Sequence, residues 1–185
     1  MKIYRLYHKV DGYKAILTKG TTLESCMLEN GNDAKFGSFK GQPFKWSDST
    51  GTKICDFPFI DGNIPVMSER AYAAINSTIT PCASHTNIDV EGSKYEIIEA
   101  KKISDTLDTE KSVIKYFKDG RIMNIKKYVF KSNVTYPAMF RVAELPIFTF
   151  VSEEIINKLK EVNCLDGLDT ELCGIESGSR RATSL

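Results

Sequence analysis

Two segments of this chain have the spacing of hydrophobic residues that is typical of an amphipathic helix. The clearer one follows Ser152, and its apolar residues recur along one side of a helix at Ile155, Ile156, Leu159 and Val162. Ser152 is a suitable N-cap for this helix and Asn163 a suitable end. The second segment follows Ser68, another suitable N-cap, and extends to about Thr78, before Pro81. The pattern therefore predicts a helix after each of these two serines.

Apolar runs and alternating patterns predict strands elsewhere, mostly in consecutive pairs. The expected hairpins join residues 2–7 to 13–18, residues 113–117 to 122–130, and residues 139–142 to 147–151. The dipeptides Asp11-Gly12 and Asp119-Gly120 favour tight turns in the first two pairs. One further strand is expected over residues 95–103, whereas residues 82–92 are expected to form a loop.

Two segments have neither pattern. Residues 29–51 are rich in Gly, Asn, Ser and Asp, so they predict a long irregular connection of a kind that is commonly functional. Residues 174–185 are polar and poor in apolar side chains, and we expect them to be a disordered tail. Because strands and helices do not alternate strictly, we predict an α+β fold. It would be a single domain over residues 1–173, with a largely antiparallel sheet, hairpins and two or three helices.

Composition and charge disfavour some classes of partner. The 185 residues are 42% apolar and 26% charged, which is ordinary for a globular domain, and the net charge is only +1. Nucleic-acid-binding proteins usually have a strong basic excess and DNA mimics a strong acidic one. Residues 1–20 nevertheless contain five basic side chains and one acid, while residues 152–176 contain two lysines and seven acids. These are either ordinary solvated faces or, for the second segment, a surface that steers a basic partner.

Nothing in the sequence favours export or membrane insertion. The first residues are charged every few positions and lack the apolar segment of a signal peptide. No run approaches the roughly 18 apolar residues of a membrane span. The five cysteines are odd in number and irregularly spaced, as free thiols are in a reducing compartment. We therefore expect a cytoplasmic protein with no membrane partner.

Candidate catalytic residues are few. Cys82 and His85 form a C-x-x-H pair, which is either half of a metal site, a thiol–imidazole couple, or a loop cysteine beside a solvent-exposed histidine. Asp105 and Asp108 either share a catalytic role or stabilise a turn. No phosphate-binding loop or nucleophile elbow is present. We expect no metal and no cofactor, and an uncharacterised small enzyme is kept only as an alternative.

A nucleic-acid-binding strand is a second alternative. Lys126, Lys127 and Lys131 interleave with Tyr128 and Phe130, which is the composition of a platform on which bases stack. The same pattern describes an ordinary strand with a solvated lysine face and an aromatic core face. We favour the ordinary strand, so nucleic acid is not the expected partner.

Residues 55–75 have the most distinctive sequence of the chain. The block Asp56-Phe57-Pro58-Phe59 is followed by turn residues at 61–63, a short apolar run and the helix start at Ser68. No histidine, cysteine pair or phosphate loop accompanies this segment, which favours a protein that acts by binding. Trp46, the only tryptophan, either lies at the edge of the core or anchors an interface.

Three blocks of the chain resemble, in the same order, the bacterial immunity protein family eleven, formerly a domain of unknown function. They are Asp56-Phe57-Pro58 with residues 65–71, Tyr95-Glu96-Ile97-Ile98 with Asp105-Thr106-Leu107-Asp108, and Phe140-Arg141 with residues 147–152 and Leu165-Asp166-Gly167-Leu168. Together they span roughly residues 55–170. Glu99 and Cys173 depart from the family's pattern, which has an asparagine–valine pair and an aromatic residue at the corresponding places.

The resemblance implies a cytoplasmic antitoxin of a polymorphic toxin system. Such a protein binds one cognate toxin domain, delivered by contact-dependent or type VI secretion, and occludes its active site. It has no enzymatic activity of its own. The contact residues that we expect for this partner are Trp46, Asp48, Asp56, Phe59, Glu69 and Arg70.

Overall fold

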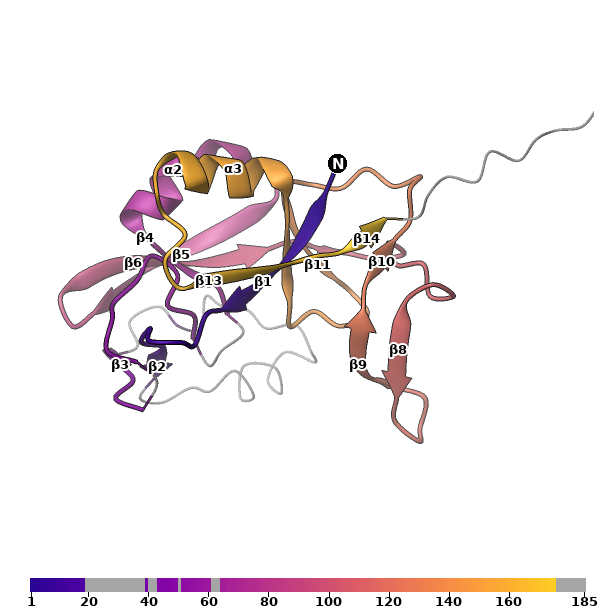
Figure 1. Cartoon of the computed structure of the whole chain (residues 1–185), viewed down its shortest axis with the longest axis horizontal. Helices are drawn as coiled ribbons and strands as arrows, with labels where there is room; N and C mark the ends of the chain where they lie inside the picture. Colours follow the sequence, from indigo (N-terminus) through magenta and orange to yellow (C-terminus); the bar gives the residue numbers. More distant parts are fainter. Residues whose placement is uncertain (19–38, 40–42, 50, 61–63, 176–185) are drawn as a thin grey trace, which may run out of the picture.

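The structure is a computed structural model that describes residues 1–18, 39, 43–49, 51–60 and 64–175 (Figure 1). In these residues two helices, α2 (Glu69–Ile79) and α3 (Glu153–Glu161), accompany sheets whose strands are mostly antiparallel. The predicted α+β class is therefore confirmed. Most of the long connection at 29–51 lies outside the described residues, as do the turn at 61–63 and the end of the tail.

Both helices begin where the serines predict. The Oγ atom of Ser68 accepts a hydrogen bond from the backbone N–H of Ala71 at 3.2 Å, which satisfies a donor in the first turn of α2. Ser152 precedes α3, but its side chain makes no capping bond, and its Oγ is buried without a partner among the described residues. Asn163 follows α3 with a left-handed φ of 53°. Neither of these described helices is long and apolar enough to cross a membrane.

A five-stranded sheet combines strands from the start, middle and end of the chain. Its order is β13-β1-β12-β11-β7, with β1 at Ile3–His8, β7 at Lys102–Ile103, β11 at Met139–Val142, β12 at Thr149–Ser152 and β13 at Leu168–Leu172. Neighbours are antiparallel except for β11 and β7. The pairing of β11 with β12 confirms the strand pair predicted from residues 139–142 and 147–151.

A second five-stranded sheet combines strands from residues 16–100. Its order is β2-β3-β5-β6-β4, with β2 at Ile16–Thr18, β3 at Phe44–Trp46, β4 at Val66–Ser68, β5 at Ala83–Val90 and β6 at Ser93–Ala100. The β5–β6 hairpin turns at Glu91 and Gly92, whose φ values of 52° and 88° suit a two-residue turn. The expected loop at 82–92 is therefore wrong. The side chains of β5 are mostly solvent-facing and polar, so its sequence lacks apolar alternation although its backbone pairs fully with β6.

The predicted hairpin of residues 2–7 and 13–18 is also wrong. The strand β1 lies between β12 and β13, whereas β2 pairs with β3 in the other sheet. Gly12 does turn the chain, with a φ of 81°, but Tyr13 after it forms a bridge with Lys53. A turn dipeptide fixes local geometry only, and it does not determine which strand the returning chain joins.

Two short sheets complete the described structure. The strands β8 (Val113–Tyr116) and β9 (Ile122–Lys127) form the predicted hairpin, which projects at the lower right of Figure 1. The strand β10 (Val129–Phe130) pairs in parallel with β14 (Gly174–Ile175). Two residues of the expected tail are thus part of a strand, and residues 176–185 lie outside the description.

In the described part of the chain, buried side chains form three hydrophobic clusters. The largest joins both helices to the sheets and includes Ile75 of α2 and Leu159 of α3. The second lines the second sheet, and the third gathers the aromatic residues near β10. In the third cluster the rings of Phe130, Phe140 and Phe150 lie 5.3 to 5.6 Å apart between centroids. Each such buried ring contributes about 1.5–3 kcal/mol through removal of apolar surface from water.

Candidate functional site

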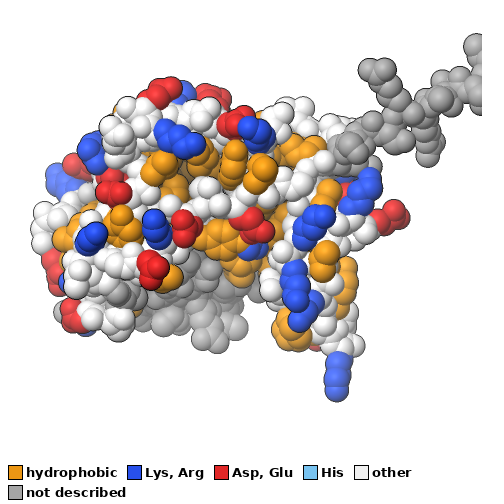
Figure 2. Space-filling model, viewed as in Figure 1, with side chains coloured by type: hydrophobic (Ala, Val, Ile, Leu, Met, Phe, Trp, Pro, Cys, Tyr) orange, Lys and Arg blue, Asp and Glu red, His pale blue; other side chains and the backbone are white. Residues whose placement is uncertain are grey.

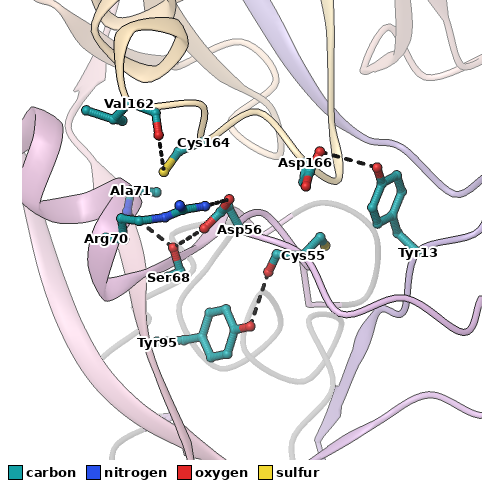
Figure 3. A network of polar contacts seen from close by, with 10 residues as sticks. All are labelled: Tyr13, Cys55, Asp56, Ser68, Arg70, Ala71, Tyr95, Val162, Cys164 and Asp166. Carbon is teal, nitrogen blue, oxygen red and sulfur yellow. Dashed lines mark hydrogen bonds and ion pairs between the residues drawn. The ribbon is translucent and has the colours of Figure 1, made fainter.

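The distinctive segment of the sequence forms a polar joint at the start of α2. We call it the Asp56 joint and define it by Asp56, Ser68 and Arg70 (Figure 3). Asp56 is only 8% exposed; its Oδ1 accepts a hydrogen bond from Ser68 Oγ at 2.5 Å, and its Oδ2 accepts one from Arg70 Nη2 at 2.9 Å. This contact with Asp56 raises the pKa of Arg70. Because Ser68 also caps α2, a single carboxylate fixes the cap and the chain that precedes it.

Residues from each of the three sequence blocks of the resemblance lie around this joint. The backbone N–H of Phe57 donates to the carbonyl of Asp166 at 3.0 Å, and the Tyr95 hydroxyl donates to the carbonyl of Cys55 at 3.1 Å. Gly167 lies against Cys55 so closely that a Cβ atom there would be 2.3 Å from the Cys55 sulfur. Burial raises the pKa of the Cys55 thiol to about 12, so this cysteine is a packed, protonated side chain. The distinctive residues therefore hold segments distant in sequence together.

Two of the expected contact residues belong to the core. Trp46 is 6% exposed and packs edge-on against Tyr95, with ring centroids 5.6 Å apart. Phe59 is 1% exposed and has a left-handed φ of 46°. Their rings are covered, which corrects the expectation that they anchor an interface. The alternative in which Trp46 lies in the core is the one that the structure supports.

The other expected contact residues are placed differently. Asp56 is buried at the joint and in direct contact with Arg70, whose side chain is 64% exposed. Asp48 and Glu69 are exposed, and Glu69 occupies the first turn of α2, where a carboxylate stabilises the positive end of the helix dipole. The structure thus brings Asp56 and Arg70 together, but in a contact that stabilises the fold.

The residues considered for catalysis have structural partners. No group of three or more His, Cys, Asp or Glu side chains is arranged to hold a metal within the part of the chain that the structure describes. The observed contacts are the Cys82 thiol with the carbonyl of Ile79 at 3.3 Å, Asp105 with Lys131, and Asp108 with Lys111 at 3.1 Å. Each carboxylate of the Asp105/Asp108 pair is therefore bound to a lysine.

His85 belongs to a small polar cluster on β5 and β6. Its Nδ1 lies 2.8 Å from Glu96 Oε2, and Asn87 donates to the other oxygen of Glu96 at 3.0 Å. The ring of Tyr72, from α2, lies 4.7 Å from the His85 ring between centroids. Because Glu96 is 7% exposed, these hydrogen bonds compensate a carboxylate that burial would otherwise destabilise. Sequence reasoning missed the cluster since it depends on the register of two strands.

The basic and acidic segments of the chain neutralise each other in part. Strand β1 of the basic segment pairs with β13 of the acidic one. Arg5 forms an ion pair with Glu171 at 3.0 Å, and Lys2 pairs with Glu153 at 2.6 Å. The Arg5 guanidinium also lies over the ring of Tyr7, 4.2 Å from its centroid. Basic and acidic segments that are separate in the sequence therefore lie side by side in the fold.

The aromatic residues of the lysine-rich strand are buried. Tyr128 and Phe130 are part of the third hydrophobic cluster and are 2% and 0% exposed. Their rings are covered and present no face on which bases can stack. The interpretation of this segment as a strand with a core-facing aromatic side is the one that the structure supports.

A different group of apolar residues is exposed on the neighbouring β8–β9 hairpin. We call it the hairpin surface: Val113, Tyr116, Phe117 and Met123, each between 46 and 54% exposed. Other residues of the hairpin attach it to the body, because Ile125 is buried in the third cluster and Ile114 and Ile122 pack against it. Single exposed apolar side chains are common, whereas four on one short element make this hairpin a candidate interaction surface. The hairpin was predicted from its turn and apolar pattern, but which of its apolar residues face solvent was not.

The same hairpin is basic. It carries Lys115, Lys118, Arg121, Lys126 and Lys127 against a single acid, Asp119. Arg121 pairs with Asp119 at 2.8 Å, but the four lysines make no ion pair with any described residue. Figure 2 shows basic and apolar side chains side by side along the projecting element.

A pocket of about 360 Å³ lies where the hairpin meets the connection between β11 and β12. The hairpin contributes Phe117, Arg121 and Ile122, and the connection contributes residues 143–147. The guanidinium of Arg121 lies 5.6 Å from the centroid of the Phe117 ring. The walls are thus mainly apolar, with Arg121 and Glu144 as their charged members.

Comparison with known proteins does not place this chain. No family model matches the sequence, and no curated protein matches it either. The resemblance to immunity protein family eleven remains an expectation from the three sequence blocks.

Proposed function

We propose that this protein is an immunity protein that binds a cognate bacterial toxin domain and neutralises it by occluding its active site. The observation that carries the proposal is the hairpin surface. Four large apolar side chains are exposed on a two-stranded element that projects from the body. Burial of these side chains against a partner would remove them from water, which is the main driving force of protein association.

The shape of the hairpin supports occlusion as the mode of inhibition. Active sites are usually concave and mostly apolar, with a small number of polar groups. A projecting element with two exposed aromatic residues, Tyr116 and Phe117, is complementary to such a cleft. Aromatic side chains are frequent anchors of tight interfaces because they bury a large area with few rotatable bonds. A self-protection complex would bury roughly 1,600 Å² or more in total.

The sequence resemblance supports the choice of a toxin as the partner. Tyr95 of the second block and Asp166 of the third contact the chain on either side of Asp56, so these residues stabilise the fold that presents the hairpin. The proposal therefore separates the residues that resemble the family from the residues that bind. It also includes the cytoplasm as the place of action, since an immunity protein protects the cell that makes it from delivered toxin.

The test is co-expression with the toxin domain encoded beside this gene, in a bacterial host that the toxin kills. We expect restored growth and a stable one-to-one complex on copurification. A matched pair of variants separates binding from folding: Phe117→Ser lies on the hairpin surface, and Leu172→Ser lies on β13 with a 57% exposed side chain. The proposal fails if equimolar protein leaves the toxin fully active.

A further inference from the structure

The pocket beside the hairpin surface has the lining of a site for an apolar side chain of a partner. Its volume of about 360 Å³ is at the lower end of the range for ligand sites. Phe117, Leu145 and Ile147 provide apolar walls, and Phe117 also belongs to the exposed hairpin surface. A segment that packs on the Phe117 ring therefore also reaches the wall of the pocket.

The charges around the pocket indicate which charge the partner segment carries. Lys115, Lys118, Lys126 and Lys127 are exposed along the hairpin and have no ion-pair partner among the described residues. The local excess of basic side chains contrasts with the near-neutral charge of the whole chain. Carboxylates on a partner would complement these lysines, which raises the association rate and selectivity.

Glu144 argues for a polypeptide partner over a nucleic acid. It lines the pocket, and its Oε2 is buried without a hydrogen-bond partner among the residues that the structure describes. A carboxylate in the wall disfavours a phosphate held directly beside a base in the pocket. It also requires the partner's own carboxylates to lie along the lysines, with only an uncharged side chain inside the pocket. Arg121 also lies over the Phe117 ring, where a base would have to stack.

The backbone of the hairpin favours an extended partner. In the described residues β8 and β9 pair only with each other, so each has one edge whose N–H and C=O groups are not used by a third strand. An extended segment can add to such an edge through main-chain hydrogen bonds while its alternate side chains reach the surface.

We infer that the β8–β9 hairpin and its pocket bind an extended, acidic segment of a partner protein that inserts one apolar side chain between Phe117 and the β11–β12 connection. The inference rests on the proposed function only for the identity of the partner as a toxin domain. The chemistry of the segment does not depend on that function: its carboxylates contact the four lysines, and one apolar residue occupies the pocket.

The experiment uses three labelled decapeptides and the full-length protein. The first peptide has glutamates and aspartates around a central phenylalanine; the second replaces that phenylalanine with serine; the third replaces the acids with lysines. Fluorescence anisotropy gives affinities, and backbone amide NMR locates the site. We expect binding of the first peptide, with shifts confined to residues 113–127 and 143–147, and about tenfold weaker binding of the second. The third peptide should not bind.

Protein variants provide the matched controls. Phe117→Ser and the double variant Lys126→Glu/Lys127→Glu should each weaken the first peptide about tenfold. Leu172→Ser and Lys94→Glu change exposed side chains of the same types on other elements and should leave its affinity unchanged. Amide spectra of all variants show whether the fold is retained, so a loss of binding is separated from a loss of structure.

Three results would overturn the inference: no binding of the first peptide at about 1 mM, shifts outside the hairpin and pocket, or tighter binding of a ten-nucleotide oligothymidylate at the same residues. The co-expression test remains separate. If wild-type protein rescues growth and Phe117→Ser rescues equally, the hairpin site is wrong while the immunity function stands. If the peptide binds as expected but no rescue occurs, the tested toxin domain is not the partner, while the acidic-segment site stands.

Discussion

The Asp56 joint and the β8–β9 hairpin are opposite kinds of region. The joint has the most distinctive sequence in the chain, yet its central carboxylate is buried and all its contacts are internal. The hairpin has an ordinary sequence of alternating lysines and apolar residues, yet it exposes four large apolar side chains. The comparison teaches that the distinctive motif of this chain lies where several buried polar contacts have to form together. A binding surface needs only the right side chains outside the core.

The largest expected difference concerns two phenylalanines. Phe130→Ala removes a ring that is 0% exposed in the third cluster, and we expect a loss of about 3–5 kcal/mol of unfolding free energy. Phe117→Ala removes a ring that is 46% exposed, so its loss should be below about 1 kcal/mol. Urea unfolding followed by circular dichroism measures both. Equal losses would mean that the hairpin surface is part of the core.

The next difference concerns two glycines with a left-handed backbone. Gly167→Ala at the joint would place a Cβ 2.3 Å from the Cys55 sulfur and 2.8 Å from the Phe57 carbonyl oxygen. We expect it to cost about 3 kcal/mol, from strain and clash together. Gly120→Ala in the hairpin turn meets nothing within 4 Å, so only the backbone penalty of about 1 kcal/mol applies. Thermal unfolding of both variants checks the order, which would be reversed if the joint were loosely packed.

Removal of the joint's carboxylate should have a somewhat smaller effect. Asp56→Ala deprives Ser68 and Arg70 of their acceptor, and we expect a loss of about 2 kcal/mol. Asp48→Ala, at an exposed position, is the control and should change stability by less than about 0.5 kcal/mol. Chemical denaturation gives both values. If Asp56→Ala kept full stability but abolished toxin binding, the joint would be a contact site after all.

The smallest expected effects are in the pH dependence. Burial lowers the pKa of His8, which stacks on Phe59 near the joint, below its usual 6.5. The unfolded chain therefore binds the proton first, and stability falls as pH decreases from about 6.5 towards the lowered folded value. In the hairpin, hydrogen bonds from the backbone N–H and guanidinium of Arg121 lower the pKa of Asp119 below 3.8. Its contribution is complete above that value and is lost only as pH falls through the lowered one.

The pH ranges in which His8 and Asp119 affect stability can be distinguished by substitution. His8→Gln should flatten the decline between about pH 7 and about pH 5, and Asp119→Asn should leave that decline intact. Urea midpoints across this range measure the slopes. A slope unchanged by His8→Gln would contradict the assignment of the near-neutral effect to His8.

Two local signals in the sequence were correct because each acts on residues close to it in the chain. Asp119-Gly120 joins β8 to β9, and Ser68 caps α2. A local signal was wrong where the partner is distant, because Asp11-Gly12 turns the chain but β1 pairs with β12 and β13. The strand β5 was missed since its outward side chains are polar and only its pairing with β6 makes it a strand.

The same difference between local signals and long-range contacts applies to the candidate site. Sequence alone determined the α+β class, the two helix starts, the lysine-rich hairpin and the segment that carries the family resemblance. Tertiary structure decided that Trp46 and Phe59 are buried and that Phe117 is exposed. It also brought Tyr95 and Asp166 to Cys55 and Phe57, on either side of Asp56, and paired Arg5 with Glu171. Local backbone preferences are encoded within a few residues, whereas burial and charge pairing depend on contacts between residues far apart in the chain.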